Sequence, residues 1–106
     1  MNKILERLDL TIQRKITESP NKSHTARLLK KVTEKCAEKF GEEAIELIVA
    51  CVKKKKKEVI REAADTLYHM CVLLRSKNIS INQVLSELAS REGISGIEEK
   101  RKRNTK

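Results

Sequence analysis

The chain has 106 residues, of which 37% are charged and 2% aromatic, and its formal net charge is +9. This length predicts a single domain, residues 1–106, and three glycines and one proline are too few for a turn-rich β-sandwich or barrel. The composition therefore predicts an all-α fold, while the positive charge predicts an anionic partner without identifying it.

Apolar residues three and four apart predict four helices. Pro20 ends the first helix, and the five consecutive lysines at 53–57 indicate a break after the second, because like charges so close together repel. Ser80 and Gln83 form a capping box at the start of the fourth helix, and a basic tail occupies residues 94–106. The expected helices are 3–18 within an N-terminal segment 1–20, about 23 or 25 to 52, 58–76, and 80 to about 93.

The cysteines and the apolar runs bear on the cellular compartment. Cys36, Cys51 and Cys71 lie in apolar helical stretches and form no CxxC pair. An odd number of cysteines without a secretory segment predicts reduced, buried thiols and a cytoplasmic location. The longest apolar run, residues 44–52, is too short to span a bilayer and contains Glu46, so no membrane association is expected.

Two stretches, residues 44–52 and 63–74, carry apolar side chains nearly all around their predicted helices. A helix with this pattern is buried on most sides. One short chain cannot easily bury two such helices alone. We therefore expect a bundle of four to five helices that is completed by homodimerisation or by a larger assembly.

Carboxylates inside these apolar stretches form two pairs with equal spacing. Glu43 and Glu46 are three residues apart, and Glu62 and Asp65 repeat this spacing on the next helix. A buried carboxylate must be neutralised, paired or bound to a metal. In an antiparallel helix pair these acids would meet at one point without a cation between them. Mg²⁺, which prefers oxygen ligands and substrate phosphates, would satisfy them, so the pattern indicates phosphate chemistry.

Other polar residues have structural alternatives. Acids three or four apart arise by chance in helical chains, so Glu34 and Glu38 are interpreted as a solvated face. His69 shares the predicted face of Glu62 and Asp65, and it is either a core histidine bonded to a carboxylate or a residue near the substrate. The lysine run at 53–57 is interpreted as a solvated turn rather than a binding patch.

The acids read Glu42-Glu43-x-x-Glu46 and then Glu62-x-x-Asp65, which resembles the ExxE…ExxD signature of the all-α, MazG-like nucleotide pyrophosphohydrolases. Three longer segments are similar to the phosphoribosyl-ATP pyrophosphatases of that superfamily. The similarity covers about residues 23–103, whereas the first twenty residues resemble nothing specific. The three segments are KFGEEAIE (39–46), EAADTLYHMCVLL (62–74) and REGISGIEEK (91–100).

This resemblance implies Mg²⁺-dependent hydrolysis of 1-(5-phosphoribosyl)-ATP to 1-(5-phosphoribosyl)-AMP and pyrophosphate, the second step of histidine biosynthesis. It implies that the catalytic and metal-binding residues are Glu43, Glu46, Glu62 and Asp65, with Glu42 as an additional ligand or a support for one. The residues expected to bind the phosphorylated nucleotide are Lys39, His69, Arg91, Ser95, Gly96, Glu99 and Lys100.

Two other functions stay open. The first is a house-cleaning nucleoside triphosphate pyrophosphohydrolase of the same superfamily, which shares the acids but need not share the segment at 95–100. The chain also departs from the phosphoribosyl-ATP pyrophosphatases at His24 and Val32, where an aromatic residue and a glycine are common. The second is a basic helical nucleic-acid-binding module. The scarcity of base-stacking aromatics and the absence of helix-turn-helix spacing weigh against nucleic acid as a partner.

Overall fold

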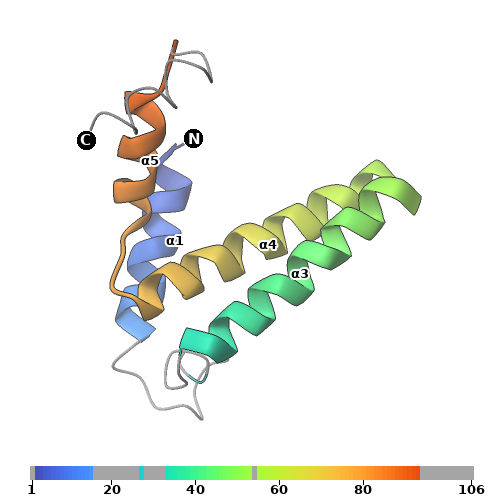
Figure 1. The fold of residues 1–106 in the computed structure, drawn as a ribbon, viewed down its shortest axis with the longest axis horizontal. Helices are drawn as coiled ribbons and strands as arrows, with labels where there is room; N and C mark the ends of the chain where they lie inside the picture. Colours follow the sequence, from blue (N-terminus) through green and yellow to red (C-terminus); the bar gives the residue numbers. More distant parts are fainter. Residues whose placement is uncertain (1, 16–26, 28–32, 54, 94–106) are drawn as a thin grey trace, which may run out of the picture.

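The computed structural model describes residues 2–15, 27, 33–53 and 55–93. Within these ranges the chain forms four helices and no strand: α1 (Asn2–Lys15), α3 (Thr33–Lys53), α4 (Lys56–Ser76) and α5 (Ile81–Ser90). Helices α3 and α4 form a long antiparallel hairpin, and α1 and α5 lie together across one end of it (Figure 1). The all-α fold class predicted from the composition is thus confirmed.

The helix boundaries agree closely with those expected wherever they can be compared. The break in the lysine run is confirmed, because α3 ends at Lys53 and Lys55 is extended, with φ −75° and ψ 155°. The capping box of α5 is also confirmed: the Ser80 hydroxyl accepts from the Gln83 N–H at 3.3 Å, and the Gln83 carboxamide accepts from the Ser80 N–H at 2.9 Å. The predicted end of the first helix and start of the second lie outside the described residues.

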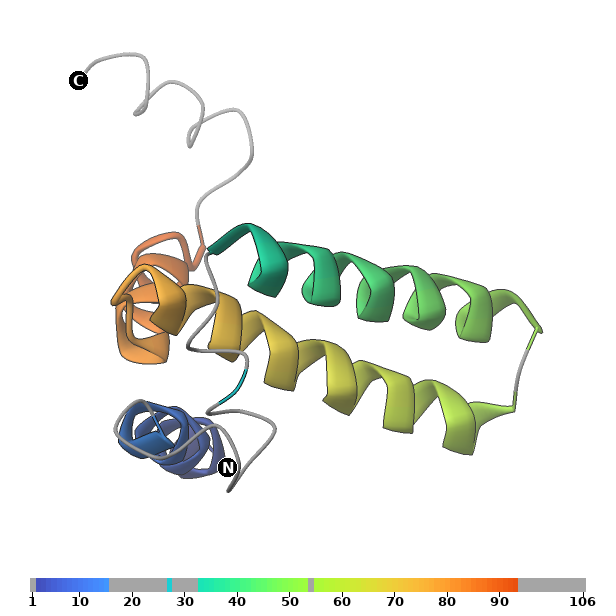
Figure 2. The same ribbon diagram turned by 90° about the horizontal axis from the view of Figure 1, so that it is seen from below.

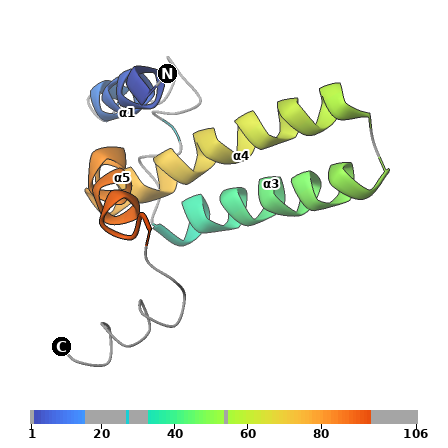
Figure 3. The ribbon, with the colours of Figure 1, turned by 90° about the horizontal axis from the view of Figure 1, so that it is seen from above.

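The main core lies where the C-terminal half of α4 meets the other three helices. Figure 2 shows α1 on the side of α4 opposite to α3, and Figure 3 shows the same order from above. The residues at the centre of this junction are only 1 to 2% exposed; α3 and α1 both pack against α4, and α5 packs against α1. The central residues are Ile12, Cys36, Cys71, Val72 and Ile81.

A buried ion pair ties three helices together beside this core. Both carboxylate oxygens of Asp9 in α1 accept hydrogen bonds of 2.8 Å from the Arg75 guanidinium in α4. The same carboxylate accepts from the backbone N–H of Ile81, the first residue of α5, at 3.1 Å. Asp9 is only 4% exposed, and this bidentate, fully hydrogen-bonded arrangement is what makes its burial tolerable. It also raises the pKa of Arg75, chiefly through the hydrogen bond to Asp9.

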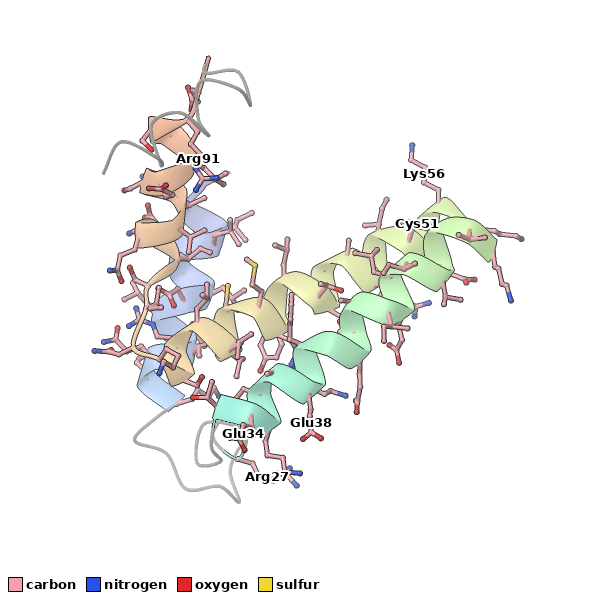
Figure 4. The ribbon with its side chains drawn as sticks, in the orientation of Figure 1. Arg27, Glu34, Glu38, Cys51, Lys56 and Arg91 are labelled. Atoms are coloured by element: carbon pink, nitrogen blue, oxygen red, sulfur yellow. The ribbon has the colours of Figure 1, made fainter. Side chains whose placement is uncertain are left out.

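The hairpin is less well covered toward its tip. Cys36 and Cys71 are buried as predicted, but the prediction was wrong for Cys51, which is exposed on α3 near the tip (Figure 4). Several large apolar side chains of the hairpin are exposed too, with Ile48 at 63% and Val52 at 78%. The apolar pattern of the sequence therefore exceeds what one chain buries. Among the described residues, no helix is long and apolar enough to cross a membrane.

Candidate functional site

The antiparallel hairpin brings the two predicted acid pairs to the same level. Glu43 from α3 and Glu62 and Asp65 from α4 each place one carboxylate oxygen within 4.8 Å of the others. Glu46 lies outside this group of three but close enough to interact with it. Its pKa is raised, first by the negative charge of Glu43 and then because its protonated form can hydrogen-bond to Glu62. The expected convergence of four carboxylates is thus met by three, with the fourth beside them.

The burial of these acids differs from the sequence-based expectation. Glu43 is buried at 8% exposure and Glu62 is half-buried, but Glu46 and Asp65 are exposed. The expectation that all four are enclosed was based on their apolar neighbours in sequence. Those neighbours are themselves exposed in the single chain, with Ile45 at 61% and Leu67 at 45%. The cluster therefore has a buried side formed by Glu43 and Glu62 and a side open to solvent.

Thr66 holds the two helices together at the level of the acids. Its hydroxyl lies 2.8 Å from the carbonyl oxygen of Glu62, one turn earlier on α4, and 3.1 Å from the carbonyl oxygen of Glu43 on α3. The single hydroxyl proton is shared by these two acceptors, so the side chain bridges the helices. This contact sets the height of Glu43 relative to Glu62. Thr66 was not among the predicted site residues, because its acceptor on α3 cannot be recognised from the sequence.

One oxygen of the cluster has no hydrogen-bond partner among residues 2–15, 27, 33–53 and 55–93. Glu62 Oε2 is buried and makes no hydrogen bond within the part of the chain that the structure describes. Leaving a buried carboxylate oxygen unsatisfied is costly, and such an atom calls for an ion or a donor that is not part of the chain. A hard divalent cation fits this position, because the converging donors are all carboxylate oxygens. The residues present therefore suit a Mg²⁺-type ion.

Lys39 lies at the edge of the cluster, one turn before Glu43. Its ammonium group is 3.3 Å from the Glu43 carboxylate and 3.9 Å from that of Glu42, and the hydrogen bond to Glu43 raises the pKa of Lys39. The expectation that no cation sits among the acids was therefore incomplete. One lysine cannot neutralise the whole cluster, so an excess of negative charge persists. Glu42 itself is exposed and lies outside the group of three converging oxygens.

An open groove of about 470 Å³ runs from the acids toward the hairpin tip. Its volume is that of a small-molecule site. Apolar side chains from α3 alternate in it with charged side chains from both helices, and Arg61 is a cation that sequence reasoning had not selected. The sequence could have suggested Arg61 as a site residue, because it directly precedes Glu62 of the acid motif. The lining residues are Ile45, Glu46, Val49, Ala50, Glu58, Arg61 and Glu62.

His69 lies one turn beyond Asp65 on α4 and is 7% exposed. Its ring meets the ring of Tyr68 edge to face, with centroids 5.0 Å apart and an interplanar angle of 83°. Burial also raises the pKa of Tyr68. Of the two alternatives for His69, this position favours a core histidine.

The remaining predicted substrate residues are far from the acids or outside the described chain. Arg91 follows the end of α5, at the opposite end of the molecule from the hairpin tip (Figure 4), and it pairs with Glu87 at 2.9 Å. The fold of one chain does not bring Arg91 to the acid cluster. Glu34 and Glu38 are exposed on the first turns of α3, as predicted for a solvated face (Figure 4). Predicted sites that lie outside the described residues are Ser95, Gly96, Glu99 and Lys100.

Comparison with known proteins identifies the lineage of this chain. The family model "Phosphoribosyl-ATP pyrophosphohydrolase" matches residues 5–92, which include α1 as well as both acid pairs. The expectation that the first twenty residues share nothing specific with this family was therefore wrong, since the match begins at residue 5.

Individual relatives agree along nearly the full length. A protein named phosphoribosyl-ATP pyrophosphatase from Dinoroseobacter shibae is 50% identical over 100 residues, which are 94% of this chain and 98% of the relative. One of the same name from Paracoccus denitrificans is 52% identical over 99 residues, covering 93% of this chain and 92% of the relative. With both acid pairs and the helices that carry them inside the matched region, the chain belongs to the phosphoribosyl-ATP pyrophosphohydrolase family.

Proposed function

We propose that the protein hydrolyses 1-(5-phosphoribosyl)-ATP to 1-(5-phosphoribosyl)-AMP and pyrophosphate, in the second step of histidine biosynthesis, with Mg²⁺ as cofactor. The observation that carries the proposal is the meeting of Glu43, Glu62 and Asp65 oxygens within 4.8 Å in a chain of this family. The unpartnered Oε2 of Glu62 supports a cation at the same point. The substrate is inferred from the names of the relatives, and the geometry of the acid cluster supports metal-dependent hydrolysis.

We assign Glu43, Glu46, Glu62 and Asp65 to hold the metal, with Glu42 as an additional ligand or support. When bound there, Mg²⁺ would neutralise phosphate oxygens and act as a Lewis acid on the phosphoanhydride. Lys39, already beside Glu43, can pair with a phosphate oxygen from the same side.

In the proposed reaction a water oxygen forms a bond to the α-phosphorus, the bond from that phosphorus to the bridging oxygen breaks, and pyrophosphate leaves. The water proton passes to a carboxylate of the cluster. Glu46 is a suitable acceptor by position, because it is exposed to solvent and lies beside the three converging oxygens.

We also propose that a second copy covers the exposed apolar side of the hairpin. Ile48 and Val52 of α3 and Ile60 of α4 are each more than 60% exposed, although apolar surface of this kind is normally buried against a partner. Residues 1–106 would then act as one domain in a homodimer or larger assembly. Light scattering coupled to size-exclusion chromatography measures the mass, and a monomer at micromolar concentration would contradict this part of the proposal.

We expect the enzyme to act in the cytoplasm. Cys36, Cys51 and Cys71 are all reduced cysteines, and a reducing compartment keeps them so. Burial further raises the pKa of the Cys71 thiol, which keeps it protonated and unreactive.

The reaction is tested by measuring pyrophosphate release from phosphoribosyl-ATP, with and without Mg²⁺, beside ATP and dUTP. Fast release from phosphoribosyl-ATP that requires Mg²⁺ supports both reaction and substrate. Preferential release from ATP or dUTP would instead assign the cluster to a house-cleaning pyrophosphohydrolase. A Glu46→Gln variant should stay folded and lose turnover, and near-normal activity in that variant would refute the role of Glu46.

A further inference from the structure

A lysine already contacts the edge of the acid cluster in the folded chain. The ammonium group of Lys39 lies 3.3 Å from the Glu43 carboxylate and 3.9 Å from that of Glu42. Glu43 is only 8% exposed, whereas 35% of the Lys39 side chain is accessible to solvent. The pair therefore joins a buried carboxylate, one of the three whose oxygens converge within 4.8 Å, to a cation that can reach solvent.

Helix stabilisation alone gives a poor account of this pair. Lys39 precedes Glu43 by four residues, and this order stabilises a helix less than the reverse order does. A similar pair one turn earlier, Lys35 with Glu38 at 3.2 Å, has side chains that are 60% and 63% exposed and is an ordinary surface contact. Lys39 differs from Lys35 because it contacts an acid of the cluster.

Glu43 cannot fully serve Lys39 and a metal at the same time. A cation of the Mg²⁺ type binds carboxylate oxygens at about 2.1 Å. An ammonium group on the same carboxylate, even on its other oxygen, would lie within a few ångströms of that ion, and the two positive charges would repel each other. The flexible stem of a lysine lets the ammonium group of Lys39 leave Glu43 without any movement of α3.

We propose that Lys39 is an exchangeable counter-ion of Glu43: it neutralises this carboxylate while the metal is absent, and it turns to a phosphate oxygen of the nucleotide once the metal is bound. The inference rests on the proposed function, which supplies the metal and the phosphate. It goes further because it makes the two binding events cooperative. Lys39 released from Glu43 is available to the phosphate, and Lys39 held by the phosphate no longer competes for Glu43.

The first test measures Mg²⁺ binding by calorimetry in the absence of nucleotide. Lys39→Met removes the ammonium group but keeps an unbranched side chain with a similar helix propensity. Lys35→Met removes the same charge one turn away and is the matched control. The dissociation constant for Mg²⁺ should fall roughly fivefold in Lys39→Met, because a competitor for Glu43 is gone, and should change less than about twofold in Lys35→Met. Equal constants in the two variants would overturn the inference.

A variant that conserves the charge separates the contact with Glu43 from other effects of the substitution. Lys39→Arg keeps the positive charge, and a guanidinium group can hold a carboxylate with two hydrogen bonds. The Mg²⁺ affinity of Lys39→Arg should therefore equal that of the wild type or be weaker. Tighter Mg²⁺ binding in Lys39→Arg as well as in Lys39→Met would contradict the exchange.

The exchange also predicts that metal affinity and nucleotide affinity move in opposite directions. With saturating Mg²⁺, the KM for phosphoribosyl-ATP should rise roughly tenfold in Lys39→Met, because a charge-assisted contact to phosphate is lost, while kcat changes less. A lysine that only binds phosphate would raise KM and leave the Mg²⁺ affinity unchanged. A lysine that only supports α3 would lower the midpoint of urea unfolding and leave both constants unchanged. Either result would overturn the inference.

These measurements separate the inference from the proposed reaction. If the expected order of Mg²⁺ affinities is found but no pyrophosphate is released from phosphoribosyl-ATP, the reaction fails while the competition at Glu43 stands. If pyrophosphate is released but the wild type and Lys39→Met bind Mg²⁺ equally well, the reaction stands and the exchange is wrong. A wild-type protein that binds no Mg²⁺ would overturn both.

Discussion

Asp9 of α1 and Glu62 of α4 are two carboxylates that are shielded from solvent but differ in their partners. Asp9, beside the C-terminal half of α4, accepts two hydrogen bonds from Arg75 and one from the backbone N–H of Ile81. Glu62, in the N-terminal half of α4, has one buried oxygen without a hydrogen-bond partner among the described residues, and it faces two other carboxylates within 4.8 Å. The first arrangement balances charge within the described chain, whereas the second has an excess of negative charge that a cation would balance.

This difference predicts that the two carboxylates respond differently to substitution. Removing the charge of Asp9 leaves the buried guanidinium of Arg75 without its carboxylate partner, so the free energy of unfolding should fall. Removing the charge of Glu62 relieves repulsion within the cluster, so stability should hold while function is lost. Active sites commonly sacrifice stability in this way.

The largest effect is expected on catalysis from Glu62→Gln. Loss of a metal ligand should reduce kcat/KM for phosphoribosyl-ATP at least about a hundredfold, since even residues that only orient ligands cost 10- to 100-fold. The midpoint of urea unfolding without Mg²⁺ should be unchanged or higher than in the wild type. A variant with wild-type turnover would remove Glu62 from the site.

The largest effect on stability is expected from Asp9→Asn. Breaking a buried, bidentate ion pair by removing one partner costs about 3 kcal/mol, because the other charge stays buried and unpaired. The free energy of unfolding comes from urea titration, and a double-mutant cycle with Arg75→Met isolates the coupling of the pair. Turnover of the folded fraction should stay near that of the wild type. A loss of stability below about 1 kcal/mol would show that solvent screens the pair, as it does at a protein surface.

The pH dependence of metal binding follows from Glu46. Its pKa is raised above the ordinary 4.5 by Glu43 and Glu62, so protons compete with the metal at a higher pH than they would for an isolated glutamate. Without metal, the raised pKa means that Glu46 favours the folded state most at low pH, and that contribution is lost as pH rises through the raised value.

Calorimetric titration with Mg²⁺ over a series of pH values measures this competition. Affinity should fall as pH drops through the raised pKa of Glu46. In Glu46→Gln the remaining fall should move to lower pH. The same pH profile in both proteins would contradict this role of Glu46.

A smaller effect is expected from Thr66→Val, which keeps the shape of the side chain but removes the proton shared by the Glu62 and Glu43 carbonyls. Stability should fall by about 1 kcal/mol, the usual net value of such a hydrogen bond. Mg²⁺ affinity should fall roughly tenfold, because the two acids lose their fixed relative height. Thr66→Ser, which retains the hydroxyl, should restore affinity. If both variants bind Mg²⁺ equally well, packing alone sets the height of the helices.

Much of the hairpin could be predicted from the sequence, because local signals determine it. The equal spacing of Glu43–Glu46 and Glu62–Asp65 and the lysine break between the helices together predict an antiparallel pair with facing acids. The Ser80–Gln83 capping box likewise predicts the start of α5. Each of these signals depends on residues a few positions apart, where helix geometry alone fixes which side chains meet.

What could not be predicted depends on contacts between distant residues. Asp9 and Arg75 are 66 positions apart, and neither has a local pattern that identifies the other. The exposure of Glu46, Asp65 and Cys51 was missed for a different reason. An apolar pattern predicts that a face will be covered, but it does not say whether the same chain or another one provides the cover. The contact made by Thr66 could not be predicted for the same reason as that of Asp9, because its second acceptor lies on another helix.

The measurement that tests the central contrast most directly is thermal unfolding with and without Mg²⁺ for the wild type, Asp9→Asn and Glu62→Gln. A ligand that binds only the folded state raises Tm. We expect Mg²⁺ to raise Tm in the wild type and by a similar amount in Asp9→Asn, from a lower starting value, but not in Glu62→Gln. An equal Mg²⁺ shift in Glu62→Gln, or no shift in the wild type, would contradict the assignment of the acid cluster as a metal site.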